Sequence, residues 1–103
     1  MSKRIEKKIL PEYFQFVRNR QKTFELRKDD SDYEVGDILI LREWDGNQYT
    51  GHKLTREITY IFRDTYAEFG LQDGYCILAI QPTGWNDPML HPSYFCVADG
   101  EDE

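Results

Sequence analysis

The sequence has little of what a secreted, membrane-spanning or disulfide-stabilised protein needs. Its two cysteines, Cys76 and Cys96, are too few for a disulfide framework. No apolar run approaches the ~20 residues of a membrane-spanning helix, and the N-terminus lacks the apolar stretch of a signal peptide. We therefore expect no membrane association and a cytoplasmic location. Cys76 is expected to be a small core residue in a strand.

Motifs for common enzyme chemistries are also missing. The sequence has no nucleophile elbow, no His/Cys/Asp arrangement with metal-ligand spacing and no glycine-rich phosphate loop. Its two histidines are His52, which follows a hairpin glycine, and His91, which lies among prolines; both positions are typical of surface residues. We predict no cofactor and no metal site.

The chain also lacks the net positive charge that attracts nucleic acid, because its net charge is -6. The charge is unevenly distributed, however. Residues 1–28 contain nine basic and three acidic residues, a net charge of +6, and the remaining residues carry -12. This asymmetry indicates either a basic face suited to an anionic partner or a solvated helix face combined with an acidic tail.

The 103 residues suffice for one domain with a single core. After Pro11, apolar residues recur at helical spacing and predict an amphipathic helix to about Arg20, with Tyr13 and Phe14 in the core. Strands are predicted at residues 22–28, 38–44, 53–62 and 75–80, with a short one possible before Pro11. These elements predict a small α+β domain built on a barrel-like sheet.

Two strands have a pattern that predicts which side chains face the core. In residues 53–62, Leu54, Ile58, Tyr60 and Phe62 share one face, which Arg56 interrupts at an open end of the sheet. In residues 22–28, Phe24 and Leu26 are expected in the core. The opposite face then forms a charged strip, over which Lys22 can swing from the preceding junction; the strip consists of Thr23, Glu25 and Arg27. Asp37 follows a glycine turn and is expected to accept hydrogen bonds from nearby N–H groups.

The composition changes after Ile80. We divide the chain into a domain at residues 1–81 and an extension at residues 82–103, where three prolines disfavour regular structure. Residues 85–95 are too apolar for a free tail. They form either a strap over the barrel or a docking patch for a partner protein, and the acidic residues 99–103 are expected to be solvated.

An ordered set of motifs resembles a known family. The set consists of residues 10–14, 22–28, 35–37 and 41–45. Together they resemble a small ASCH-like domain of unknown function from bacteria and phages, within the PUA-like superfamily, over residues 5–81. The ASCH signature is a glycine, a lysine two residues later, and then a glutamate and an arginine. Lys22, Glu25 and Arg27 match it, and Arg20 stands where the glycine usually lies.

The resemblance implies a PUA-like β-barrel of about five strands, with the helix packed beside it and a cleft between them. It also implies binding of RNA or of a nucleotide-like molecule. Arg27 would pair with a phosphate or a guanine edge, Lys22 would supply a charge to phosphate, and Glu25 would accept from a base amino group. The aromatic residues expected in or beside loops would stack on bases; they are Tyr33, Trp44 and Tyr49.

Three alternatives stay open. The charged residues can simply pair with one another and hold the rim of the barrel. Some ASCH-like proteins are amidohydrolases acting on acylated nucleosides; here Lys22 matches their lysine, whereas Glu25 occupies the position of their threonine. The chain can also be a protein-interaction module of phage or bacterial origin that uses its C-terminal extension.

Overall fold

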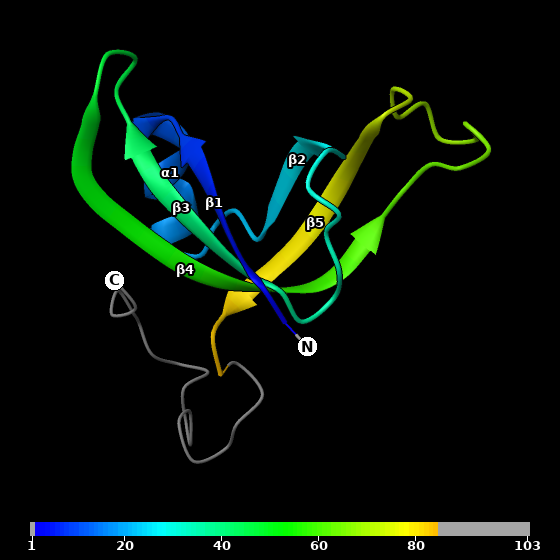
Figure 1. The fold of residues 1–103 in the computed structure, drawn as a ribbon. Coiled ribbons are helices and arrows are strands. Elements are labelled where there is room, and N and C mark those ends of the chain that lie inside the picture. Colours follow the sequence, from blue (N-terminus) through cyan, green and yellow to red (C-terminus); the bar gives the residue numbers. More distant parts are fainter. Residues whose placement is uncertain (1, 85–103) are drawn as a thin grey trace.

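The computed structural model describes residues 2–84, which form five strands and one helix (Figure 1). The strands are β1 (Arg4–Ile9), β2 (Phe24–Lys28), β3 (Ile38–Trp44), β4 (Tyr49–Phe62) and β5 (Tyr75–Pro82), and helix α1 spans Pro11–Arg18. The α+β class and the early helix are confirmed. The expected strap or docking patch at residues 85–95 lies outside the described residues.

The five strands form one mixed sheet that curls into a half-barrel (Figure 1). Their order is β1-β3-β4-β5-β2; β1 pairs with β3 in parallel, and the other pairs are antiparallel. A barrel-like sheet was expected, and the sheet is a half-barrel whose two edges are β1 and β2. A side chain connects these edges, because Arg27 Nη2 donates to the Lys8 carbonyl over 2.8 Å.

Helix α1 covers the concave side of the half-barrel with a narrower face than its sequence predicts. Phe14 and Val17 are buried, whereas Leu10 and Tyr13 are about half exposed. The prediction that Tyr13 lies in the core is therefore wrong. A helix of eight residues contacts the sheet along one narrow stripe, and the side bearing Leu10 and Tyr13 borders the opening between β1 and β2.

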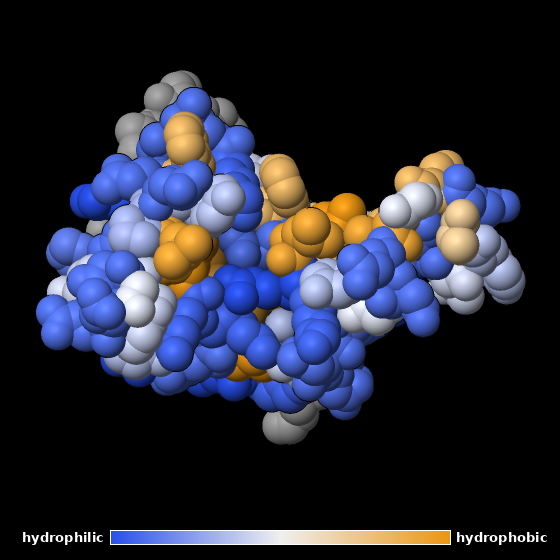
Figure 2. Space-filling model, turned by 90° about the horizontal axis from the view of Figure 1, so that it is seen from above, coloured by the Kyte–Doolittle hydropathy of each residue, from blue (hydrophilic) through white to orange (hydrophobic). Residues whose placement is uncertain are grey.

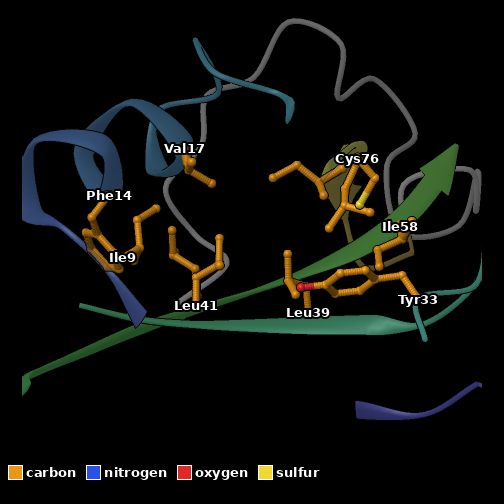
Figure 3. Packing of buried hydrophobic residues seen from close by; sticks show 11 residues of the cluster. Ile9, Phe14, Val17, Tyr33, Leu39, Leu41, Ile58 and Cys76 are labelled. Atoms are coloured by element: carbon orange, nitrogen blue, oxygen red, sulfur yellow. The ribbon is translucent and has the colours of Figure 1, made fainter. Parts of the chain in front are cut away.

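The core lies between α1 and the sheet (Figure 3). Ile9, Phe14, Val17 and Leu41 pack at the helix end of this core, and Cys76 lies at its other end. Burial raises the pKa of the Cys76 thiol, so this cysteine stays un-ionised. Its predicted role as a small core residue is confirmed.

A bulge in β4 reverses the predicted inward face of that strand. Ile58 pairs with Ile80 and Tyr60 pairs with Ala79, so Thr59 is an extra residue. Tyr60 is consequently 62% exposed, and Ile61 packs against the core instead. The prediction that Tyr60 faces inward is wrong because strict alternation does not reveal an inserted residue.

Arg56 was expected at an open end of the sheet, and its side chain is instead buried. Its Nη2 donates to the Val17 carbonyl and its Nη1 to the Thr55 carbonyl, both over 2.9 Å. The last carbonyls of a helix lack partners within the helix, so a buried guanidinium is a suitable donor for them. Arg56 thereby ties the C-terminal turn of α1 to the sheet.

The loop that joins β4 to β5 projects from the body of the molecule (Figure 1). The Asp64 carboxylate accepts hydrogen bonds from the N–H groups of Glu68, Phe69 and Leu71, which holds the loop in turns. Across residues 2–84, no helix has the length and apolarity needed to span a membrane.

Candidate functional site

Strand β2 points its glutamate inward, opposite to the expected arrangement. Glu25 is only 4% exposed, whereas Phe24 and Leu26 are 47% and 55% exposed. The prediction that Phe24 and Leu26 lie in the core is therefore wrong. A carboxylate is rarely buried unless it is paired, and here a cation pairs with each side of it: Lys22, which precedes β2, and Arg27, which lies within it.

These three charged residues form one hydrogen-bonded cluster, which we call the Lys-Glu-Arg cluster. Lys22 Nζ donates to Glu25 Oε2 over 2.7 Å and to the Phe24 carbonyl over 2.9 Å. Arg27 Nε donates to Glu25 Oε1 over 3.1 Å, and Arg27 Nη2 reaches the Lys8 carbonyl on β1. Both carboxylate oxygens are thus occupied, and the two cations are held in fixed positions.

The Lys-Glu-Arg cluster borders a cleft of about 520 Å³ between the free edges of the sheet. The lining residues come from β1, the start of α1 and β2; they are Lys8, Ile9, Leu10, Tyr13, Lys22, Phe24, Glu25, Leu26 and Arg27. Because the cleft follows the free edge of β2, side chains from both faces of that strand border it. Figure 2 shows hydrophobic surface on both sides of a hydrophilic strip on this face of the molecule. The volume lies within the range typical of small-molecule sites.

Two rings flank the cations at the cleft. Lys22 Nζ lies 4.9 Å from the centre of the Phe24 ring and 5.6 Å from that of Tyr13. Both rings are about half exposed, so each keeps surface available to a ligand. Within residues 2–84, no hydrogen bond occupies Nη1 of Arg27, which leaves two N–H donors at the cleft.

Other residues predicted for the site lie elsewhere. Thr23 is exposed and outside the cleft lining, and its carbonyl accepts from the Ile80 N–H over 3.0 Å. Asp37 is fully buried, where it accepts from the Lys3 ammonium over 2.7 Å and from two backbone N–H groups. Burial alone would raise the pKa of Asp37, but these hydrogen bonds outweigh it and hold the pKa below its ordinary value. Asp37 therefore has a structural role.

The aromatic residues predicted as stacking platforms are also outside the cleft. Tyr33 is buried in the core, so its ring is inaccessible from solvent. Trp44 ends β3, where its ring meets Tyr49 edge-on at 5.0 Å. The rings that do border the cleft belong to Tyr13 and Phe24. The short helix α1 buries only Phe14 and Val17 of its apolar residues. An apolar stripe wider than so short a helix can bury was the feature of the sequence that could have indicated an exposed Tyr13.

A model of the family described as "Domain of unknown function (DUF3850)" matches residues 6–80. The chain belongs to the DUF3850 family. This DUF3850 domain includes every residue of the cleft. The chain is also 44% identical over 59 residues to the "Uncharacterized 12.9 kDa protein in GpA 3'region" of Escherichia phage P2. That similarity covers 57% of this chain and 54% of the phage protein, so the chain spans about half the length of this relative.

Lysine chemistry is disfavoured by the contacts of Lys22 in this DUF3850 domain. A nucleophilic or basic lysine needs a free lone pair, whereas the Lys22 ammonium donates to a carboxylate and to a carbonyl. Glu25, the neighbour that could act as a base, already accepts from both cations. Lys22 and Glu25 are thus both engaged within the Lys-Glu-Arg cluster.

Proposed function

We propose that this DUF3850 domain binds RNA or a nucleotide-like ligand in the cleft beside α1. The observation that carries the proposal is a largely buried Lys-Glu-Arg cluster, in which Glu25 pairs with both cations, at the edge of a cleft lined mainly by apolar residues and by Lys8. Because Glu25 fixes both cations before any ligand arrives, a phosphate meets donors that need little further ordering. A binding site gains affinity from such preorganisation.

The cleft offers the two kinds of contact that a nucleotide requires. A base can stack against the exposed surfaces of Tyr13 and Phe24, since aromatic stacking contributes roughly 1–3 kcal/mol per base. A phosphate can accept from the Nη1 donors of Arg27 and from Lys22, in charge-assisted hydrogen bonds. Local charge agrees with this, because Lys8, Lys22 and Arg27 face a single carboxylate among the lining residues.

The resemblance to ASCH-like domains of the PUA-like superfamily supports the same function. The residues that match the ASCH signature are the three that converge at the cleft. Arg20, which stands where that signature has glycine, has a φ of 69°, a backbone conformation that favours glycine.

The experiment is an NMR titration of the labelled chain with nucleoside monophosphates, nucleosides and a short single-stranded RNA. We expect saturable shifts at residues 22–27 and at Tyr13. Arg27→Gln should weaken binding at least about tenfold, because each charge-assisted hydrogen bond contributes roughly 1.5–3 kcal/mol. The matched control is Lys28→Gln, which removes one charge from an exposed position on the same strand.

Two results would count against the proposal. An absence of shifts with nucleotides and with RNA would remove it and leave the cluster as an ion-pair network that holds the sheet edges together. Hydrolysis of an acylated nucleoside in the same samples, lost in Lys22→Gln, would replace it with the amidohydrolase alternative.

A further inference from the structure

The outer face of the sheet carries a row of three cations. Lys8 of β1 is paired with Arg42 of β3, and Arg42 is paired with Lys53 of β4. Like charges at directly opposed positions of a sheet repel one another. Three basic side chains in one row across three strands are therefore unfavourable for the fold alone, in a chain whose net charge is -6.

Few acidic groups compensate this row. Glu6 lies 3.6 Å from Arg42 and is mostly exposed, so the pair contributes little. Among residues 2–84, neither Lys8 nor Lys53 has an ion-pair partner. The row is thus a locally positive surface.

Two aromatic rings lie next to the row. Lys8 Nζ is 3.9 Å from the centre of the Trp44 ring, and Arg42 Cζ is 3.8 Å from the centre of the Tyr49 ring. Trp44 and Tyr49 are themselves paired across β3 and β4. Cation–π contacts hold the basic groups beside flat apolar surfaces. Basic groups interleaved with aromatic rings are the combination that binds single-stranded nucleic acid.

The outer face is continuous with the cleft. A hollow of about 370 Å³ is lined by Glu6, Lys7, Lys8, Arg42 and Tyr49, and a second of about 200 Å³ continues past Arg42 to Lys53. Lys8 also lines the cleft itself. An anionic ligand can therefore pass from the cleft over the edge of β1 onto the outer face along Lys8, Arg42 and Lys53, and Glu6 is the acidic residue that lines both hollows.

We propose that a single-stranded RNA with one nucleotide in the cleft continues over β1 onto this outer face. Its phosphates accept from Lys8, Arg42 and Lys53, and a base lies against Trp44 or Tyr49. This inference rests on the proposed function, since it extends the same ligand beyond the cleft. Adjacent strands are about 4.8 Å apart, so the row spans roughly 10 Å across the sheet.

The test compares a mononucleotide with a single-stranded RNA of about eight nucleotides, a length within the range that one small domain covers. The RNA should bind at least about tenfold more tightly than the mononucleotide. Arg42→Gln with Lys53→Gln should abolish most of that gain and leave mononucleotide affinity unchanged. The salt dependence of RNA binding should fall by about 1.4 in slope, at about 0.7 for each lost phosphate contact.

Matched controls separate a surface effect from a loss of charge or fold. Lys28→Gln should keep the length-dependent gain in affinity. The double variant should unfold at about the same urea concentration as the original chain, because the relief of repulsion offsets the loss of the contacts of Arg42 with Glu6 and Tyr49. In a Trp85→Phe background, Trp44 fluorescence should be quenched by the RNA and not by the mononucleotide.

The outcomes distinguish the two proposals. If the mononucleotide binds in the cleft but RNA binds no more tightly, or if the gain survives in the double variant, the path over β1 is wrong and the proposed function stands. If neither the mononucleotide nor the RNA binds, both are wrong. RNA binding that depends on Arg42 and Lys53 without any mononucleotide binding would overturn the cleft as the starting point of the path.

Discussion

At the scale of single residues, the charge of Glu25 is the feature on which the cleft depends. In Glu25→Gln the amide keeps the shape of the side chain, but Lys22 and Arg27 lose their common counter-ion. Both cations are about one-fifth exposed and stay partly hydrated. We therefore expect the free energy of unfolding to fall by about 1–3 kcal/mol, below the full cost of breaking a buried pair.

Urea unfolding at pH 7 measures this loss. Glu34→Gln is the control, because Glu34 is largely exposed and its ion pair with Lys3 is long, at 3.9 Å; it should change stability by less than about 0.5 kcal/mol. Equal losses in the two variants would show that Glu25 is not a buried partner of the two cations.

The buried carboxylate of Asp37 predicts a dependence on acid pH. Its pKa in the folded chain lies below the ordinary value of 3.8. The ionised form therefore stabilises the fold above about pH 4, and this contribution disappears as the pH falls through the lowered pKa. Asp37→Asn should cost about 1–3 kcal/mol at pH 7. The difference from the original chain should narrow below pH 4, as measured by urea unfolding at a series of pH values. A difference that stays constant down to pH 2 would contradict this role.

The sequence could predict the grouping of the Lys-Glu-Arg cluster, because its members lie within six consecutive residues at and just before β2. It could not predict which way they face. Phe24 and Leu26 compete with Glu25 and Arg27 for the inner side, and local alternation alone favours the apolar pair. The edge position of β2 and the reach of Arg27 to β1 reverse that preference, and both are tertiary features.

At the scale of elements, the bulge in β4 gives a prediction that contradicts the alternating pattern. The pattern places Tyr60 inward and Ile61 outward, and the structure has the opposite. Ile61→Ala should therefore lower the free energy of unfolding by about 1–3 kcal/mol, somewhat less than for a fully buried isoleucine. Tyr60→Ala should lower it by less than about 1 kcal/mol, the span of strand propensities.

Urea unfolding of the two variants, made in the same background, decides the comparison. A larger loss for Tyr60→Ala than for Ile61→Ala would mean that the strand continues without a bulge. The neighbouring hairpin needs no such test, because Asp45-Gly46-Asn47 is a sequence typical of hairpin turns and residues 45–48 join β3 to β4. There the Asp45 carboxylate accepts from the N–H groups of Asn47 and Gln48. Turn chemistry is local and can be predicted from sequence, whereas a bulge depends on the partner strand.

At the scale of the whole molecule, the open sheet is what places the cleft. The cleft lies where a closed barrel would have paired β1 with β2, and the apolar and charged groups that line it belong to the two free edges. Among the strands, the charged residues are also concentrated at these two edges. The basic residues of the first 28 positions include those at the cleft, and a single acidic residue of β2 organises them. The composition alone indicates a basic segment, but only the curl of the sheet brings its parts together.

Hydrogen exchange should detect this arrangement. In the free chain, amides of the central strands β3 and β4 should exchange most slowly. Those of β2, a five-residue strand paired on one side, should exchange fastest among the strands. A nucleotide at about 100 times its dissociation constant should stabilise the fold by about 2.7 kcal/mol. If it spans the cleft, it contacts both edges of the sheet at once. Protection should then rise in β2 and the C-terminal half of β1 more than in β5, as mass spectrometry of exchanged peptides can show. If protection rose uniformly, or chiefly in the loop between β4 and β5, the ligand would not be joining the two edges, and the open side of the half-barrel would not be its binding site.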